Sequence, residues 1–220
     1  MPDDFSIHPT PDGSSTVYSS RYGQHYHSTH GALTQSRVVY LEGTQTQLHP
    51  APKVLEVGFG MGLNFLTTLR DALERGVSLH YIALEFDPAP AEVLEVTLSN
   101  HPFAANGIWH DVLTRWGESF TLKRDGVVLE VVCEDVTTLD LPLEWATAVY
   151  LDGFSPGVNP EIWTLETAQK LSRTMLPGGW LSTYSAAGAV KRALEGAGLE
   201  IHKKPGMRGK REFITAFKPL

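Results

Sequence analysis

The chain has 220 residues, 42% of them hydrophobic and 20% charged, with a net charge of −7 at pH 7 and a single cysteine, Cys133. This length and composition predict one ordinary domain with a buried core and exclude collagen-like, low-complexity and disordered chains. One cysteine excludes an intrachain disulfide and a cysteine cage for a metal ion. The apolar runs are too short to span a membrane, and the first residues lack a secretory signal, so we expect a cytoplasmic protein.

The charge is distributed unevenly along the chain. Residues 187–220 contain eight lysines and arginines against three glutamates, a net charge of +5, whereas the first 186 residues carry −12. A basic end on an acidic body favours a local contact with an anionic partner. The alternative is a solvated basic face that binds nothing.

The N-terminal 52 residues differ in composition from the rest. They are rich in Thr, Ser, Tyr and His, with β-like pieces at residues 15–18 and 37–42 separated by turn residues. We therefore expect residues 1–52 to form a small β extension and residues 53–220 to form the main domain.

Apolar strands and helical segments alternate from residue 53 onward. Strands are expected at residues 53–57, 79–85, 127–133, 148–152, 179–184, 199–203 and 212–217. Helices are expected at residues 63–75, 91–99, 108–120, 160–175 and 186–197. This order predicts an α/β fold with a mostly parallel, seven-stranded sheet covered by helices on both faces. The last strand should run antiparallel, because the final connection is too short for a crossover helix.

Ligands of such sheets bind beyond the carboxyl ends of the strands, and the first strand runs into Gly58, Gly60 and Gly62. Glycines there let the backbone turn tightly and approach a ligand. Leu63 stands where the dinucleotide fingerprint requires a third glycine or alanine, and the Gly-Lys-Ser/Thr end of a phosphate loop is absent. The spacing favours a nucleoside held without phosphates, although glycine turns after strands also serve packing alone.

Acidic residues follow the next three strands. Glu85 ends the second strand, where a carboxylate can accept hydrogen bonds from both hydroxyls of a ribose. Asp135 follows the third strand as the candidate acceptor for an adenine amino group, with Glu134 as its competitor, and either could simply cap a turn. Asp152 ends the fourth strand in an Asp-Gly-Phe-Ser-Pro turn, which resembles the Asn/Asp-Pro-Pro-aromatic turn of amino-group methyltransferases.

Other reactive side chains carry weaker signals. His25, His27 and His30 lack a cysteine or a nearby carboxylate to complete a ligand set, so we expect a histidine-rich surface or a substrate contact and no metal site. Cys133 lies in an apolar strand and is expected in the core. Ser155 has no charge-relay context, which argues against a hydrolase.

Several motifs together resemble one known family. They are LEVGFGMGLNFL (55–66), LDGFSPGVNPEIWT (151–164), and the segments at 18–43, 176–200 and 206–216. Over nearly its whole length the chain is similar to the methyltransferase half of the MnmC family, the bifunctional enzymes of the tRNA wobble uridine. The resemblance implies a Rossmann-like class I methyltransferase that uses S-adenosylmethionine. It also implies the conversion of 5-aminomethyl-2-thiouridine to 5-methylaminomethyl-2-thiouridine in tRNA.

Some features of the chain depart from that family. Because 220 residues cannot also hold the flavin oxidoreductase half of the longer enzymes, the resemblance implies a stand-alone methyltransferase. Met61 stands where threonine is common, and Ser155 stands where alanine is common. Gly157-Val158 stands where Ala-Lys is common, which removes one cation that could contact RNA and bears on the choice of substrate.

The motifs and the resemblance assign hypothetical roles to individual residues. Asp152 would orient the substrate amine and take its proton, directly or through water. The cofactor would be held by Gly58, Phe59, Gly60, Gly62, Asn64, Glu85 and Asp135. The uridine would stack on Phe154 or Trp163, and the tRNA phosphates would contact Lys203, Lys204, Arg208, Lys210 and Arg211.

Three alternative functions stay open on the sequence. A methyltransferase of the same fold could act on a small-molecule or protein amine, which the acidic body fits slightly better. A dinucleotide-dependent oxidoreductase is a second alternative, against which Leu63 argues. An RNA-binding module without catalysis is a third, against which the turn at Asp152 argues.

Overall fold

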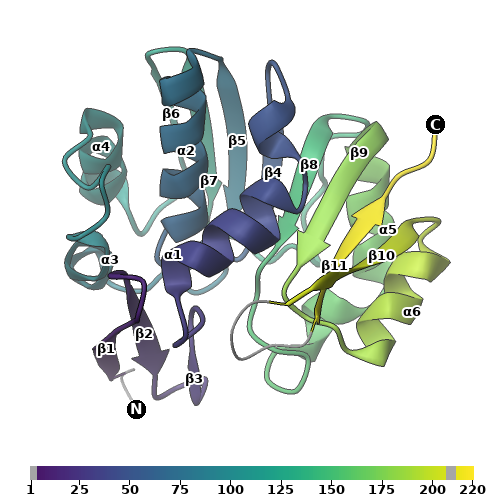
Figure 1. Cartoon of the computed structure of the whole chain (residues 1–220), viewed down its shortest axis with the longest axis horizontal. Coiled ribbons are helices and arrows are strands. Elements are labelled where there is room, and N and C mark those ends of the chain that lie inside the picture. The colour runs from purple at the N-terminus through teal and green to yellow at the C-terminus, as the bar shows by residue number, and fades with distance from the viewer. Residues whose placement is uncertain (1–3, 207–211) are drawn as a thin grey trace.

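An eight-stranded mixed sheet forms the centre of the computed structural model, which describes residues 4–206 and 212–220 (Figure 1). Its strand order is β10-β11-β9-β8-β4-β5-β7-β6. The strands are β4 (Lys53–Val57), β5 (Leu79–Leu84), β6 (Phe120–Arg124), β7 (Val127–Val132), β8 (Ala146–Leu151), β9 (Met175–Thr183), β10 (Glu200–Pro205) and β11 (Glu212–Phe217). The five consecutive strands β9-β8-β4-β5-β7 pair in parallel. Strand β11 runs antiparallel to both of its neighbours, β9 and β10. The predicted α/β fold with an antiparallel last strand is confirmed.

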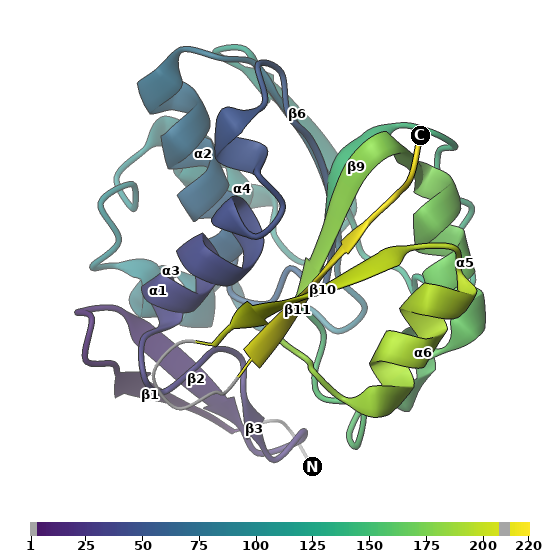
Figure 2. The same ribbon diagram turned by 45° about the vertical axis from the view of Figure 1, so that its right-hand side comes forward.

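Helices cover both faces of the sheet, as Figures 1 and 2 show. One face carries α2 (Leu63–Arg75), α3 (Ala91–Leu98) and α4 (Gly107–Arg115), and the other carries α5 (Leu165–Thr174) and α6 (Gly188–Gly196). Each face buries its own hydrophobic core, the first around Leu66 and Leu69 and the second around Leu171 and Leu194. Among the described residues, no helix is both long and apolar enough to cross a membrane.

The sheet has one strand more than predicted. The helix predicted at residues 108–120 ends at Arg115, and the chain returns as β6, antiparallel to β7. A two-residue turn joins the two strands, with φ of 51° at Asp125 and 78° at Gly126. Asp-Gly is a preferred pair for a hairpin turn that needs positive φ at both positions. The Asp-Gly pair is therefore a hairpin signal that the sequence contains. The helix predicted at residues 108–120 is too long, because its last residues belong to the connection that leads into this hairpin.

A second, three-stranded antiparallel sheet precedes the main one, with β1 (Phe5–Pro9), β2 (Ser15–Ser19) and β3 (Gln24–His25). The strand predicted at residues 15–18 belongs to β2. The strand predicted at residues 37–42 is wrong, because α1 (Ala32–Gln35) continues there into a second helical segment, η1 (Ser36–Glu42), followed by η2 (Thr46–Leu48). In η1 the buried residues Ser36, Val39 and Tyr40 recur at helical spacing and pack against α2, so tertiary packing overrides the β-branched valines.

The N-terminal segment packs directly onto the main domain. Val17 of β2, Ala32 of α1 and Tyr40 of η1 belong to the same hydrophobic core as α2. The boundary that we expect at residue 52 stays a prediction. In Figure 1 the small sheet of β1, β2 and β3 lies below the main sheet, whereas α1 and the helical segment after it run across the face of the main sheet, beside α2.

Gly62 precedes α2 at a φ of +81°, which glycine adopts freely. A Cβ atom there would lie 2.7 Å from Trp109 Cη2 and 2.8 Å from Phe59 Cε1. Gly62→Ala should lower the free energy of unfolding, measured in urea, both by straining the backbone and by forcing buried rings to move. We expect the movement of the rings to cost about 1–3 kcal/mol in addition to the backbone strain. Gly198→Ala is the control, since Gly198 has the same φ of +81° and no atom within 4 Å of the place of its Cβ. Equal losses in the two variants would contradict this account.

Candidate active site

A cavity of about 860 Å³ opens at the carboxyl ends of β4, β5, β7 and β8. Its wall also includes residues 21–30 of the N-terminal segment and Tyr184, which follows β9. Ligands of open α/β sheets bind at this edge. Of the predicted site residues, the wall contains Gly58, Gly60, Glu85, Asp135, Asp152 and Phe154.

Two of the three predicted glycines line this cavity. Gly58 and Gly60 follow β4 with φ of +88° and +55°. A Cβ atom on Gly58 would lie 2.5 Å from the backbone oxygen of Asp152, so any side chain there would push apart the ends of β4 and β8. Gly62 lies outside the wall, against Trp109. Glycine at position 58 thus lets β4 and β8 end close together, and the backbone at Gly58 and Gly60 borders the cavity.

Glu85 contacts the glycine loop from the end of β5. Its carboxylate accepts hydrogen bonds from the backbone N–H of Gly60 (2.7 Å) and of Asp87 (3.0 Å). Burial raises the pKa of Glu85, and the two backbone hydrogen bonds oppose that rise. A carboxylate held beside a glycine loop fits the predicted acceptor for the hydroxyls of a ribose.

The loop after β7 brings Glu134 and Asp135 to the cavity wall. The Asp135 carboxylate accepts a hydrogen bond from the Thr137 N–H (2.8 Å), so it also caps its own turn. Lys170 of α5 stabilises this loop. Its ammonium donates hydrogen bonds to the backbone carbonyls of Val136, Thr137 and Leu139 at 2.8–2.9 Å. Nothing in the sequence near Lys170 indicates this contact, which spans more than thirty residues of chain.

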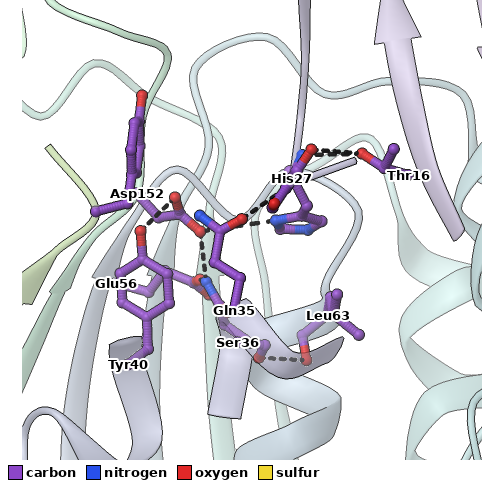
Figure 3. Close-up of polar contacts among 12 residues, drawn as sticks. Thr16, His27, Gln35, Ser36, Tyr40, Glu56, Leu63 and Asp152 are labelled. Carbon is purple, nitrogen blue, oxygen red and sulfur yellow. Dashed lines mark hydrogen bonds and ion pairs between the residues drawn. The ribbon is translucent and has the colours of Figure 1, made fainter. Parts of the chain in front are cut away.

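Asp152 lies at the base of the cavity, and its side chain is only 2% exposed. Its Oδ1 accepts a hydrogen bond from the Tyr40 hydroxyl, and its Oδ2 accepts one from Asn64 Nδ2 at 2.7 Å (Figure 3). Burial, and then the Asp152 carboxylate, raise the pKa of Tyr40 well above its usual value, so its hydroxyl stays a donor. The carboxylate is thereby fixed in one orientation.

Asn64 lies beneath Asp152 and does not line the cavity. Its amide nitrogen also donates to Glu56 of β4 (2.8 Å), which accepts a second hydrogen bond from the Tyr81 hydroxyl (2.8 Å). Burial raises the pKa of Glu56 well above its usual value, and these two hydrogen bonds oppose the rise. Asn64 was predicted to hold the polar end of the cofactor, and the structure places it where it supports Asp152.

Aromatic rings from the N-terminal segment cover the turn after Asp152. Tyr22 stacks on Phe154 with a centroid distance of 4.2 Å, and Tyr26 meets the same ring edge-on at 4.9 Å. Gln24 pairs with Ser155 through both its amide atoms, at 2.6 and 3.2 Å. One face of Phe154 is therefore already covered, so a stacked base would need its other face.

Several predicted site residues lie away from the cavity. Trp163, in the short helix η3 (Pro160–Trp163), is buried and donates its indole N–H to the Phe154 carbonyl (2.9 Å), so it supports the turn from behind. Phe59 packs between Phe65 and Trp116. Exposed lysines at positions 203 and 204 lie on the edge strand β10. The remaining basic residues of the prediction lie outside the described part of the chain: Arg208, Lys210 and Arg211.

The sequence did not reveal that aromatic rings of the N-terminal segment form part of the cavity wall. Tyr22 and Tyr26 line the cavity, as does Phe86 after β5, which is 68% exposed. His25, His27 and His30 also line it, which agrees with the substrate contact that was one of the two alternatives expected for them. The sequence shows that this segment is rich in Tyr and His, but it does not show that the segment folds against the ends of the main strands. Within residues 4–206 and 212–220, no group of three or more His, Cys, Asp or Glu residues could hold a metal ion.

Comparison with known proteins relates the chain to methyltransferases. A family profile described as S-adenosyl-L-methionine-dependent methyltransferase matches residues 101–219. The chain belongs to this methyltransferase family. It is 38% identical over 218 residues to the tRNA 5-methylaminomethyl-2-thiouridine biosynthesis bifunctional protein MnmC of Aromatoleum aromaticum, and 36% identical over 225 residues to that of Cupriavidus metallidurans. These matches cover 92% and 93% of the chain but only 34% and 33% of the relatives, so the chain spans about a third of their length.

Solved structures support the same fold. The crystal structure of MNMC2 from Aquifex aeolicus has a TM-score of 0.78 and 24% sequence identity, covering 99% of this chain and 72% of that one. Spermidine synthase from Thermotoga maritima has a TM-score of 0.58 at 13% identity, covering 98% of this chain and 69% of that one. Both likenesses concern the fold.

The cavity of this methyltransferase fits S-adenosylmethionine. The cavity of about 860 Å³ opens beside Gly58 and Gly60, and Glu85 and Asp135 present carboxylates to the same wall. Carboxylates also attract the positive charge of a sulfonium donor. The individual contacts of these residues with the cofactor remain predictions.

Glu85→Ala is expected to weaken the binding of S-adenosylmethionine by about 10-fold or more, because hydrogen bonds to a charged group contribute about 1.5–3 kcal/mol. Isothermal calorimetry measures this affinity directly. Glu92→Ala, on the exposed side of α3, is the control and should bind as the wild type does. An unchanged Kd for Glu85→Ala would remove Glu85 from the cofactor site.

Proposed function

We propose that this chain transfers a methyl group from S-adenosylmethionine to the amine of 5-aminomethyl-2-thiouridine at the tRNA wobble position, forming 5-methylaminomethyl-2-thiouridine. The observation that carries the proposal is the 38% identity, over 92% of the chain, to a relative named for that product. The geometry supports it, because a fixed carboxylate lies at the base of a cavity large enough for a nucleoside beside the cofactor. An enzyme that acts on tRNA would work in the cytoplasm.

The chain's part in this reaction is mainly to position the reactants. S-adenosylmethionine supplies an electrophilic methyl group on a positively charged sulfur. Gly58, Gly60, Glu85 and Asp135 would hold that cofactor against the ends of β4, β5 and β7. Holding two reactants in line removes much of the entropic barrier to a displacement.

Asp152 would hold the amine that receives the methyl group. Its carboxylate is oriented by Tyr40 and Asn64, so it presents a fixed acceptor to an N–H of the substrate. A negative charge in a cavity with little access to water also attracts a cationic alkylamine. Phe154, covered on one face by Tyr22, would bound the space for the uracil ring.

Basic residues at the same edge of the sheet would contact the tRNA backbone. The pairing of Pro205 with Glu212 and of Ile214 with Thr183 places the end of β10 and the start of β11 at the carboxyl edge of β9. Lys203 and Lys204 lie on β10 near that edge, and both are exposed. Phosphate contacts by such lysines strengthen binding without reading sequence.

A methyltransferase acting on a small-molecule or protein amine is the alternative. The observation that favours it is the acidic lining of the cavity, which includes Glu85, Glu134, Asp135, Asp152 and Glu161 and would attract any cationic amine. The two proposals differ in the need for RNA. Free alkylamines and modified tRNA should therefore be compared as acceptors in one assay.

Asp152→Asn should keep its affinity for S-adenosylmethionine and lose methyl transfer to the modified tRNA by about 100-fold or more, because a misplaced nucleophile costs about that factor. Nucleoside mass analysis after digestion of the tRNA gives the rate. Asp140→Asn, exposed and outside the cavity wall, is the control. A variant at Asp152 with wild-type turnover would refute its catalytic role.

Reversing the charges of β10 in the double variant Lys203→Glu, Lys204→Glu should weaken tRNA binding and reduce its salt dependence, since each lost phosphate contact lowers the salt slope by about 1. Cofactor affinity should not change. Lys123→Glu, on the opposite edge strand β6, is the control because it is also exposed. Equal tRNA affinity of the β10 variant and the wild type, measured by filter binding, would exclude these lysines.

A further inference from the structure

His27 lies in the cavity wall beside Asp152, and the roles proposed above leave it unused. Its side chain is only 4% exposed, and its Nδ1 lies 3.9 Å from Oδ2 of Asp152 (Figure 3). Neither ring nitrogen has a hydrogen-bond partner among the described residues. Because a buried polar group without a partner costs about 1–3 kcal/mol, this pair of nitrogens points to a ligand that completes it.

The fold fixes the main chain of His27 tightly. Thr16 of β2, itself fully buried, accepts a hydrogen bond from the His27 N–H (3.0 Å) and donates one to the His27 carbonyl (2.9 Å). The next N–H, of Ser28, donates to Gln35 of α1 (2.6 Å). The N-terminal sheet and the first helix thus hold the imidazole against the base of the cavity.

The imidazole is uncharged in these surroundings. Burial lowers the pKa of His27 to about 4, so at neutral pH one ring nitrogen carries a free electron pair. Beside Asp152, the titratable groups nearest in the fold are Tyr184 after β9 and, beneath Asp152, Tyr40 of η1 and Glu56 of β4. The cavity wall also contains Glu85, Asp87, Glu134, Asp135 and Glu161 from the main domain, and Arg21, Tyr22, His25, Tyr26 and His30 from the N-terminal segment.

Next to Asp152, His27 is the group whose ring nitrogens have no hydrogen-bond partner among the described residues. Glu56 accepts hydrogen bonds from Asn64 and Tyr81 and does not line the cavity. Burial raises the pKa of both Tyr40 and Tyr184, so their hydroxyls stay protonated. Each carboxylate oxygen of Asp152 already accepts a hydrogen bond, from Tyr40 and from Asn64. Glu85 is bonded to the backbone of the glycine loop.

We propose that His27 accepts the proton that the substrate ammonium must lose before methyl transfer. An N–H bond of the ammonium breaks, its proton moves to a ring nitrogen of His27, and the electron pair stays on the amine. That pair forms the new bond to the methyl carbon, while the carbon–sulfur bond breaks and its electrons go to sulfur. The imidazolium releases its proton to solvent as the product leaves. This inference rests on the proposed function, because it requires an alkylamine substrate.

The low basicity of His27 in the cavity does not oppose this transfer. Burial disfavours a positive charge on an ammonium as it does on an imidazolium, so both groups lose basicity when the substrate enters. Asp152 lies near either cation and stabilises the charge before and after the proton moves. Asp152 therefore orients the amine and His27 takes its proton, which separates two tasks that the sequence analysis assigned to Asp152 alone.

The test is the pH dependence of kcat/KM for His27→Phe and His27→Gln, with tRNA carrying 5-aminomethyl-2-thiouridine as the substrate. At pH 7 both variants should lose about 10²–10⁴-fold, the usual contribution of a general base. The deficit should shrink as the pH rises toward about 10, because solution then supplies the deprotonated amine. The affinity for S-adenosylmethionine should match that of the wild type.

His101→Phe is the matched control. Like His27, His101 has a pKa that burial lowers to about 4, and its Nε2 has no hydrogen-bond partner among the described residues. Unlike His27, it does not line the cavity. Its pH profile should follow that of the wild type. Full activity of His27→Phe at pH 7, or a deficit of the same size at every pH, would overturn the proposal. A wild type that leaves this tRNA unmethylated would instead overturn the proposed function, and the role of His27 would fall with it.

Discussion

The buried carboxylate of Asp152 connects the parts of the chain that form the active site. A charge with 2% side-chain exposure is costly unless hydrogen bonds stabilise it. Those bonds come from Tyr40 in the N-terminal segment and from Asn64 in α2, and Asn64 in turn joins Asp152 to Glu56 in β4. The end of β8, the glycine loop and the N-terminal helices must therefore assemble together for the carboxylate to be held.

Through this dependence the N-terminal segment contributes to the cavity as well as to the hydrophobic core. The ends of the main-sheet strands and residues 21–30 both contribute to the cavity wall. The family profile matches residues 101–219, so it does not include those residues. Tyr22 contacts Phe154 and Gln24 contacts Ser155, so these residues of the N-terminal segment support the turn after Asp152.

The sequence was sufficient for features that depend on local pattern. Apolar runs followed by Gly58 or Glu85 predicted both the strands and the edge at which they meet, since carboxyl ends of parallel strands lie together. Features that depend on contacts between distant segments could not be predicted from local sequence patterns. The segment Ser36–Glu42 is helical because Val39 and Tyr40 pack against α2. The position of Asn64 beneath Asp152 and the neighbourhood of His27 arise from contacts between segments 88 and 125 residues apart.

The central claim is that this cavity methylates an aminomethyl group on the wobble uridine of tRNA. The most direct measurement is the mass analysis of wobble nucleosides in tRNA from cells that lack this chain. The account predicts that 5-aminomethyl-2-thiouridine accumulates and that 5-methylaminomethyl-2-thiouridine disappears, with both restored by the wild-type chain. An unchanged amount of 5-methylaminomethyl-2-thiouridine in those cells would contradict it.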